Sequence, residues 1–405
     1  MESGAQLNNR RRFLRLLAGS PLLGYLNFPS DWISTALAQN GQPELIATAK
    51  DAINVFDFEP VAQKNIPIGH FSYLCGVEDE ATLRANREGF GHYQLRVRRL
   101  VDISKIDTSV TLFGKKWETP ILLCPVGSQR AFHTQGEVAV ARAAKPGRYA
   151  QVLSTVASLP IEDVAAAKGE PVWFQLYRDS DWNKTLGMLR RAEAAGSSVV
   201  AFTIDNFGGR KMEQQERGRR LDTRTCSACH LGGQQDGQRK PMRTTKPVGP
   251  PLIDAGSPTW DYVKRLKDAT SMKLVLKGIV TREDAEQAME YGADGVWVSN
   301  HGGRAENSLR STIDCVAEVA AGVAGRGPVI ADSGFRRGTD IFKALALGAT
   351  AVGVGRPYIW GLGAFGQEGV EAVLEILRSE FQMVMRQAGT RSLQEISKNY
   401  VVGPI

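Results

Sequence analysis

The sequence predicts a (β/α)8 barrel with an N-terminal helical segment and a long loop after the fourth strand. Short apolar runs alternate with helix-like stretches from about residue 120 onward, which is typical of parallel βα units. The last three runs, at 295–300, 329–332 and 351–355, end in polar, glycine-rich sequences. In a (β/α)8 barrel the C-terminal strand ends carry the active site, and the loops after the last two strands usually hold a phosphate.

Eight apolar runs are predicted as the barrel strands: 121–126, 151–155, 172–177, 199–205, 273–279, 295–300, 329–332 and 351–355. They carry few charges, as expected for parallel strands that are buried on both faces. Amphipathic stretches between them predict helices, most clearly at 136–144, 182–195, 282–291 and 339–347. Upstream of the barrel, we expect one or two further helices, and the best candidate is 47–55.

The extreme N-terminus has the features of a twin-arginine export signal. A basic motif at 9–15 is followed by an apolar stretch at 16–26, and a small-x-small pattern predicts cleavage after Ala38. The alternative is a basic amphipathic helix or an uncleaved anchor. Export makes the periplasm the expected location. We therefore predict three parts: an export signal at 1–38, a segment at 39–110 that packs on the barrel, and the barrel itself at 111–405.

The composition is that of an ordinary globular protein, with 405 residues of which 42% are hydrophobic and 23% charged. The formal net charge is +7, but part of it lies in the basic motif of the N-terminus. The basic run at 96–99 is short and is better explained as a solvated strand edge. Nucleic-acid binding is therefore not expected. Five cysteines, an odd number, do not form a disulfide framework.

The connection between the fourth and fifth strands, 206–272, is much longer than the others. Long irregular loops in compact domains are usually lids, binding loops or disordered segments, and we expect this one to cover the active site. It contains Cys226, Cys229 and His230 in the Cys-x-x-Cys-His arrangement that attaches c-type haem, with Met242 as a candidate distal ligand. The alternatives are a local disulfide, a metal site or no function. We assign no metal ligands outside this motif.

Polar side chains at the C-terminal strand ends should converge on one mouth of the barrel. His301 is a base, Asp205 is a carboxylate that could orient it, and Arg304 offers a fork that matches a carboxylate. Lys277 adds a fixed positive charge. The glycine-rich turns around Arg336 and Arg356 predict a phosphate cradle. Simpler roles stay open: Asp205 as a helix cap, Lys277 as a salt-bridged lysine and Tyr177 as a packing residue.

From about residue 66 to 396 the chain resembles the family of FMN-dependent 2-hydroxy-acid dehydrogenases and oxidases. This family includes glycolate oxidase and flavin-dependent lactate dehydrogenase. The resemblance is carried by six motifs that occur in the family's order, at 174–177, 276–279, 299–304, 336–349, 355–357 and 391–396.

The resemblance implies oxidation of a lactate-, glycolate- or mandelate-like 2-hydroxy acid to the 2-oxo acid. His301 would be the base, supported by Asp205, while Arg304 binds the substrate carboxylate and Tyr177 hydrogen-bonds the substrate. Twelve residues would bind FMN: Pro125, Val126, Gly127, Ser154, Gln175, Thr203, Lys277, Asp332, Gly334, Arg336, Gly355 and Arg356. We expect a cytochrome or quinone as electron acceptor and a homo-oligomer, since related enzymes are often tetramers.

Two positions depart from the family pattern. The family usually has a substrate-contacting tyrosine in the N-terminal segment, but the matching position here is Ser72, and Tyr73 comes one residue later. The family also has an arginine seven residues after the fourth-strand aspartate. That position here is Met212, preceded by Arg210 and Lys211. Each lost charged hydrogen bond would weaken carboxylate binding by about 1.5–3 kcal/mol. The alternative function is therefore a redox relay or sensor that carries flavin, or flavin plus c-type haem, without 2-hydroxy-acid turnover.

Overall fold

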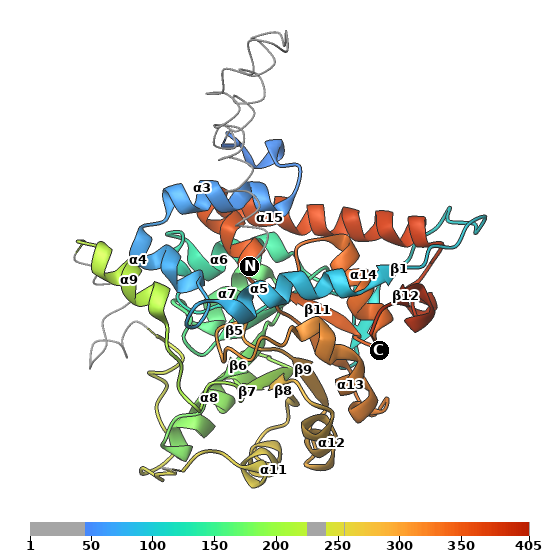
Figure 1. Cartoon of the computed structure of the whole chain (residues 1–405). Helices are drawn as coiled ribbons and strands as arrows, with labels where there is room; N and C mark the ends of the chain where they lie inside the picture. Colours follow the sequence, from blue (N-terminus) through green and yellow to red (C-terminus); the bar gives the residue numbers. More distant parts are fainter. Residues whose placement is uncertain (1–44, 225–239, 255, 405) are drawn as a thin grey trace. The chain divides into compact units, whose positions relative to one another are not determined.

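A closed barrel of eight parallel strands is the centre of the computed structural model, which describes residues 45–224, 240–254 and 256–404 (Figure 1). Around the barrel the strands follow the order β10-β11-β4-β5-β6-β7-β8-β9. Their bounds are β4 Ile121–Leu123, β5 Ala150–Ser154, β6 Trp173–Leu176, β7 Val199–Thr203, β8 Lys273–Ile279, β9 Gly295–Val298, β10 Val329–Ala331 and β11 Ala351–Val354. Each lies within a predicted strand or differs from it by one residue, so the predicted fold class is confirmed.

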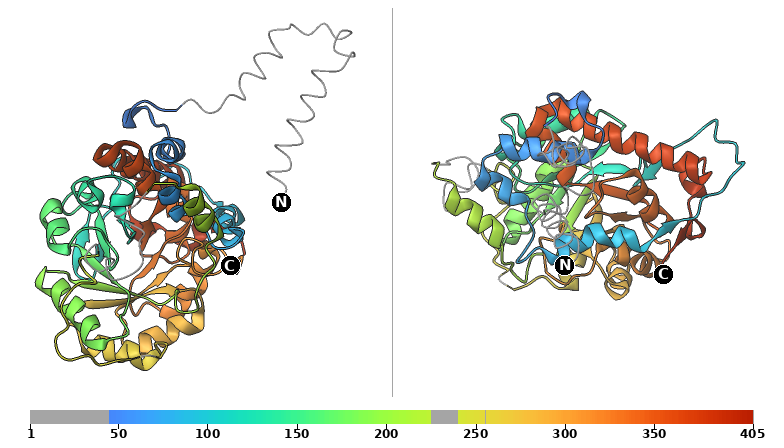
Figure 2. Two further views of the ribbon diagram at one scale, coloured as in Figure 1. Left: turned by 90° about the vertical axis from the view of Figure 1, so that its left-hand side faces the viewer. Right: turned by 45° about the horizontal axis from the view of Figure 1, so that its top comes forward.

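The helices that follow the strands lie outside the ring (Figure 2). They are α6 Gly136–Ala144, α7 Ile161–Lys168, α8 Trp182–Ala194, α9 Glu213–Leu221, α11 Trp260–Asp268, α12 Arg282–Glu290, α13 Thr312–Val323, α14 Gly338–Ala346 and α15 Arg356–Ala388. The four helices predicted from amphipathic patterns are α6, α8, α12 and α14, with bounds within one residue. Side-chain caps explain several sharp starts, because Asp181, Thr281 and Ser311 each accept a hydrogen bond from a first-turn N–H.

A short hairpin closes the N-terminal end of the barrel. Its strands are β2 (Val110–Leu112) and β3 (Lys115–Trp117), which pair antiparallel. Trp117 is buried and meets the ring of Trp173 edge-on, with the ring centroids 6.3 Å apart. The apolar side chains inside the barrel form one cluster with this hairpin. A ligand must therefore enter at the opposite, C-terminal end.

The helix predicted at 47–55 is wrong. This stretch forms two 3-10 turns, η2 (Ala49–Asp51) and η3 (Val55–Asp57), and within the described residues the first α-helix is α3 (Phe58–Asn65). The side chain of Asn54 accepts from the N–H of Phe56, and that of Asp57 accepts from the N–H of Asn54. Such local side-chain bonds compete with the helical hydrogen-bond pattern.

The N-terminal segment continues with α4 (Ile68–Phe71) and α5 (Ala81–Glu88), and α3 packs along α15. Strand β1 (Gln94–Leu95) pairs antiparallel with the C-terminal strand β12 (Val401–Val402). Further 3-10 turns are η4 Ser72–Leu74, η5 Gly89–His92, η6 Gln129–Ala131, η7 Leu393–Glu395 and η8 Lys398–Tyr400. The N-terminal segment and the C-terminal residues are thus held together directly, by the β1–β12 pair and by the packing of α3 on α15.

Some predictions fall outside the described residues. These are the export signal at 1–38 with its cleavage position, and the motif of Cys226, Cys229 and His230. Among the helices that the structure describes, none combines the length and the apolar character needed to cross a bilayer.

Candidate active site

A pocket opens at the C-terminal end of the barrel strands. It encloses about 750 Å³ of space not filled by atoms, part of it open to solvent. Twelve of the residues singled out from the sequence line it: Pro125, Val126, Tyr177, Thr203, Lys277, His301, Arg304, Asp332, Gly334, Arg336, Gly355 and Arg356. Ser154 and Gln175 lie behind the lining residues. The Ser154 hydroxyl donates to the side-chain oxygen of Gln175, and the side-chain nitrogen of Gln175 donates to the Thr203 hydroxyl at 3.0 Å.

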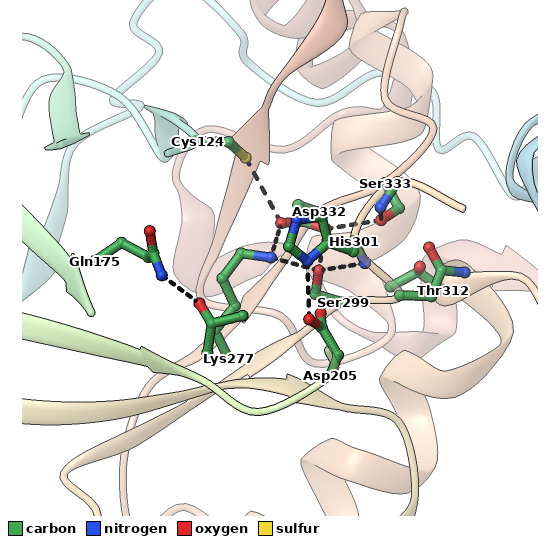
Figure 3. A network of polar contacts seen from close by, with 12 residues as sticks. Cys124, Gln175, Asp205, Lys277, Ser299, His301, Thr312, Asp332 and Ser333 are labelled. Atoms are coloured by element: carbon green, nitrogen blue, oxygen red, sulfur yellow. Dashed lines mark hydrogen bonds and ion pairs between the residues drawn. The ribbon is translucent and has the colours of Figure 1, made fainter. Parts of the chain in front are cut away.

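His301 is paired with Asp205 through a 2.8 Å contact between Nδ1 and Oδ1 (Figure 3). Burial lowers the pKa of His301, and the attraction of Asp205 only partly offsets this effect. Burial acts to raise the pKa of Asp205, but His301, Lys277 and Arg210 outweigh it and the pKa lies below its ordinary value. Asp205 is therefore an anion that accepts the Nδ1 proton of a neutral imidazole, and Nε2 is the basic nitrogen.

The basic nitrogen of His301 faces a phenol. Nε2 lies 3.3 Å from the hydroxyl of Tyr177, and the two rings are nearly parallel. Burial raises the pKa of Tyr177, so its hydroxyl stays protonated. This pair can hold a substrate hydroxyl and remove its proton, provided that the oxygen lies between the two groups.

Lys277 and Asp332 form a buried ion pair beside the histidine (Figure 3), with Nζ 3.0 Å from Oδ2. Ser299, which sequence reasoning passed over, accepts from Lys277 at 2.6 Å and donates to Asp332 at 2.7 Å. Burial acts to lower the pKa of Lys277, but Asp332 and Asp205 outweigh it, so the amine stays charged. The pocket thus has a fixed cation that could face an anionic ring or oxygen.

Tyr73, and not Ser72, belongs to the pocket. The guanidinium of Arg304 lies 4.4 Å from the centre of the Tyr73 ring, and its Nη1 donates to the carbonyls of Tyr73 and Cys75. Ser72 is buried elsewhere, where its hydroxyl donates to the carbonyl of Gly69 at 3.1 Å. Counting positions from a motif therefore located the N-terminal contact one residue too early, because the 3-10 turn η4 decides which side chain faces the barrel.

Of the three residues near the missing family arginine, only Arg210 lies close to residues of the pocket. Its Nη1 lies 3.5 Å from the carbonyl of Arg304, and its charge acts on His301 and Asp205. Lys211 is exposed and pairs with Glu213 at 2.8 Å. Met212 is the residue that precedes α9. Arg210 therefore supplies a second cation near Arg304.

The turns after β10 and β11 hold two buried arginines with unsatisfied donors. Arg336 Nε and Arg356 Nη2 are buried and have no hydrogen-bond partner. Burial and the nearby charge of Arg356 lower the pKa of Arg336 to about 9, and burial with the charge of Arg304 lowers that of Arg356 to about 10. Two crowded cations with free N–H groups are matched by a phosphate dianion.

The backbone beside these arginines is shaped for close approach. Gly334 has a φ of +87°, and a Cβ there would lie 2.1 Å from the carbonyl oxygen of Asn86. Only glycine fits this turn, which leaves its backbone open toward the pocket. Together with the unsatisfied donors of Arg336 and Arg356, this turn fits the phosphate of FMN.

Comparison with known proteins identifies the family. Residues 62–403 match the family described as FMN-dependent dehydrogenase, and the chain belongs to this family. It is 38% identical over 353 residues to glycolate oxidase 3 of Arabidopsis thaliana, covering 86% of this chain and 95% of the relative. It is 37% identical over 367 residues to an L-lactate oxidase of Nostoc sp., covering 86% and 98%. A crystal structure of mandelate oxidase with (S)-2-phenylpropionate superposes with a TM-score of 0.76 at 34% identity, covering 87% and 99%.

Proposed function

We propose that this protein oxidises a small 2-hydroxy acid to the 2-oxo acid with FMN as its cofactor. The observation that carries the proposal is the His301–Asp205 pair, with Tyr177 opposite and Arg304 alongside, at the mouth of a barrel of the FMN-dependent dehydrogenase family. The hydroxyl O–H and the adjacent C–H bonds break and a C=O bond forms. When bound, FMN accepts the two electrons and the hydrogen of the C–H bond.

Each residue has a defined part in this reaction. Nε2 of His301 takes the hydroxyl proton, and Asp205 stabilises the imidazolium that results. Tyr177 donates a hydrogen bond to the substrate oxygen. Arg304 would bind the carboxylate, and Arg210 would assist it as a nearby cation, because its charge acts on the Arg304 guanidinium and its Nη1 lies 3.5 Å from the Arg304 backbone carbonyl.

The cofactor would be held along the same mouth. Arg336, Arg356 and the backbones of Gly334 and Gly355 bind the phosphate, while Asp332 binds the ribityl hydroxyls. Pro125, Val126, Thr203 and Lys277, which line the pocket, would lie along the ring, and Gly127, Ser154 and Gln175 would complete its surroundings. Lys277 would stabilise negative charge on the reduced ring, because its amine stays charged.

Anaerobic mixing with a panel of lactate, glycolate, mandelate and longer 2-hydroxy acids tests the proposal. We expect the visible absorption of the flavin to bleach with at least one of them. If the purified yellow protein bleaches with none, the redox relay becomes the better explanation. That alternative depended on the missing contacts at Ser72 and Met212, and the positions of Tyr73 and Arg210 weaken its basis.

The proposed base predicts an acid limb in the pH profile of kcat/KM. Only the neutral ring accepts a proton, and burial holds the pKa of His301 below 6.5. The midpoint of the acid limb should therefore lie below pH 6.5, with kcat/KM rising as the pH increases through it. Measuring kcat/KM across this range checks it. An acid limb with its midpoint above pH 6.5 would show that attraction to Asp205, and not burial, determines the pKa of His301.

Replacing Arg210 by methionine should raise KM for the 2-hydroxy acid by about tenfold to a hundredfold, the effect of one charged hydrogen bond. The visible spectrum of bound FMN should not change. Lys211→Met is the matched control, because Lys211 pairs with Glu213 on the exposed surface. Equal effects of the two substitutions on KM would mean that general surface charge, and not contact with the carboxylate, attracts the substrate.

We further propose twin-arginine export to the periplasm and transfer of electrons to a cytochrome or quinone. The basic motif and the cleavage pattern support export. Turnover with oxygen against turnover with an artificial acceptor separates an oxidase from a dehydrogenase, and N-terminal sequencing of the mature protein tests cleavage after Ala38. Light scattering tests the expected homo-oligomer.

The proposal of c-type haem at Cys226, Cys229 and His230 depends on the sequence motif alone. A pyridine haemochrome spectrum of protein exported by its native host decides it. Absence of the haem band would leave a protein with flavin as its redox group.

A further inference from the structure

Two neighbouring residues of α5, Asn86 and Arg87, contact the two loops that build the pocket from opposite sides. Asn86 exchanges two hydrogen bonds with Asn300, one in each direction and both 2.9 Å long. Both amides are buried, with 1% of each residue exposed. The Asn86 oxygen also accepts from the N–H of Thr312 at 3.0 Å. A buried amide pair of this kind is costly to break, because each partner would be left unsatisfied.

Asn300 immediately precedes His301. The His301 backbone is left-handed, with a φ of +58°, which costs a non-glycine residue about 1–3 kcal/mol unless its surroundings impose it. The Asn300 oxygen that accepts from Asn86 also accepts from the N–H of Gly303 at 2.9 Å. The amide pair therefore holds closed the turn that aims the imidazole.

Arg87 holds the turn after β10, which carries Gly334 and Arg336, in a similar way. Its Nη1 donates to the carbonyl of Gly334 and, at 2.6 Å, to Oδ2 of Asp340. That carboxylate oxygen also accepts the backbone N–H groups of Arg336 at 2.9 Å and Arg337 at 3.0 Å. Arg87 therefore ties α5 to the segment that positions the guanidinium of Arg336.

We propose that Asn86 and Arg87 are positioning residues that make α5 a rigid strut between the His301 turn and the Arg336 turn. Successive side chains on a helix diverge by about 100°, so adjacent residues can reach two different loops. The carbonyl of Asn86 also lies directly against Gly334, with no room for a Cβ between them. The strut sets the separation between the proton-accepting nitrogen and the phosphate cradle. Its turnover readout rests on the proposed function.

Substitutions of the two residues should have different effects, one on kcat and the other on FMN binding. Asn86→Ala should lower kcat by about tenfold to a hundredfold, as expected for a displaced catalytic group, while KM and the FMN dissociation constant change less than about threefold. Arg87→Met should raise the FMN dissociation constant by about tenfold or more. Arg87→Lys should recover part of this loss, because an ammonium can still donate to Gly334 or Asp340.

Arg84→Ala is the control on the same helix, since Arg84 is exposed and pairs with Asp79. This substitution should change neither kcat nor the FMN dissociation constant. If Asn86→Ala does not fold, Asn86→Asp carries the test, because it keeps the volume and the acceptor and replaces the amide that donates to Asn300 with a carboxyl oxygen.

The strut is overturned if Asn86→Ala has normal kcat, or if both substitutions lower kcat, FMN affinity and thermal stability in parallel. FMN affinity is measured by titration of the apoprotein and needs no turnover. If Arg87→Met weakens FMN binding but no 2-hydroxy acid bleaches the wild-type flavin, the proposed function fails while the role of Arg87 stands.

Discussion

Replacing His301 by asparagine is expected to lower kcat/KM for the 2-hydroxy acid by about a thousandfold, the usual contribution of a well-placed general base. Asparagine is the appropriate substitute, because the φ of +58° at this position is tolerated by asparagine and resisted by most other residues. It also cannot accept the proton as imidazole does. FMN should remain bound, since no predicted phosphate contact involves His301.

Stopped-flow bleaching of the flavin measures this effect directly on the reductive step. His92→Gln is the matched control, because it removes another imidazole that pairs with Asp314 away from the pocket. If the His301→Asn protein is reduced at a rate within tenfold of wild type, another group removes the proton and the assignment of the base is wrong.

Arg336→Met is expected to have opposite effects on the two forms of the protein. FMN affinity should fall by about tenfold to a hundredfold, because a charged hydrogen bond to the phosphate is lost. The apoprotein should melt at the same or a higher temperature. Without a phosphate, Arg336 is a buried cation with an unsatisfied Nε beside a second cation, and burying such a charge is costly. Methionine can pack on Trp360, which the guanidinium now covers at 4.5 Å.

Calorimetry of the apo and FMN-loaded forms measures both predicted changes, the loss of FMN affinity and the equal or higher melting temperature of the apoprotein. Arg337→Met is the control from the adjacent position, since Arg337 pairs with Glu380 at 2.8 Å. Its FMN affinity should stay within about threefold of wild type. A lower melting temperature of apo Arg336→Met would show that this arginine stabilises the fold and is not held in an unfavourable state for the phosphate.

The barrel was predictable because its strands follow local rules. Each is a short apolar run that ends in glycine or polar residues, and parallel strands of a closed barrel must present those ends at one mouth. That rule alone predicts that His301, Asp205 and Arg304 lie in one group. The helices between the strands were predicted for the same reason, from their amphipathic pattern.

The contributions from outside the barrel were not predictable in this way. Whether Ser72 or Tyr73 faces the mouth depends on a 3-10 turn packed on distant residues, and periodicity carries no such information. The kink in α15 at Phe365 and Gly366 also escaped prediction. It arises where Gly366, with a φ of +61°, passes so close to His133 that a Cβ would lie 2.9 Å from that ring. Asn86 and Arg87 have partners more than 200 positions away.

The pairing of β1 with β12 has a consequence for synthesis of the protein. The segment that carries Tyr73, Asn86 and Arg87 is synthesised before the barrel, yet it is fastened to β12 and α15, which are synthesised after most of the barrel. A nascent chain that stops before residue 356 would also lack one of the two arginines proposed to bind the phosphate. We therefore expect FMN to bind only after β12 has been synthesised, and a chain that stops before β12 should accumulate as a colourless, protease-sensitive product.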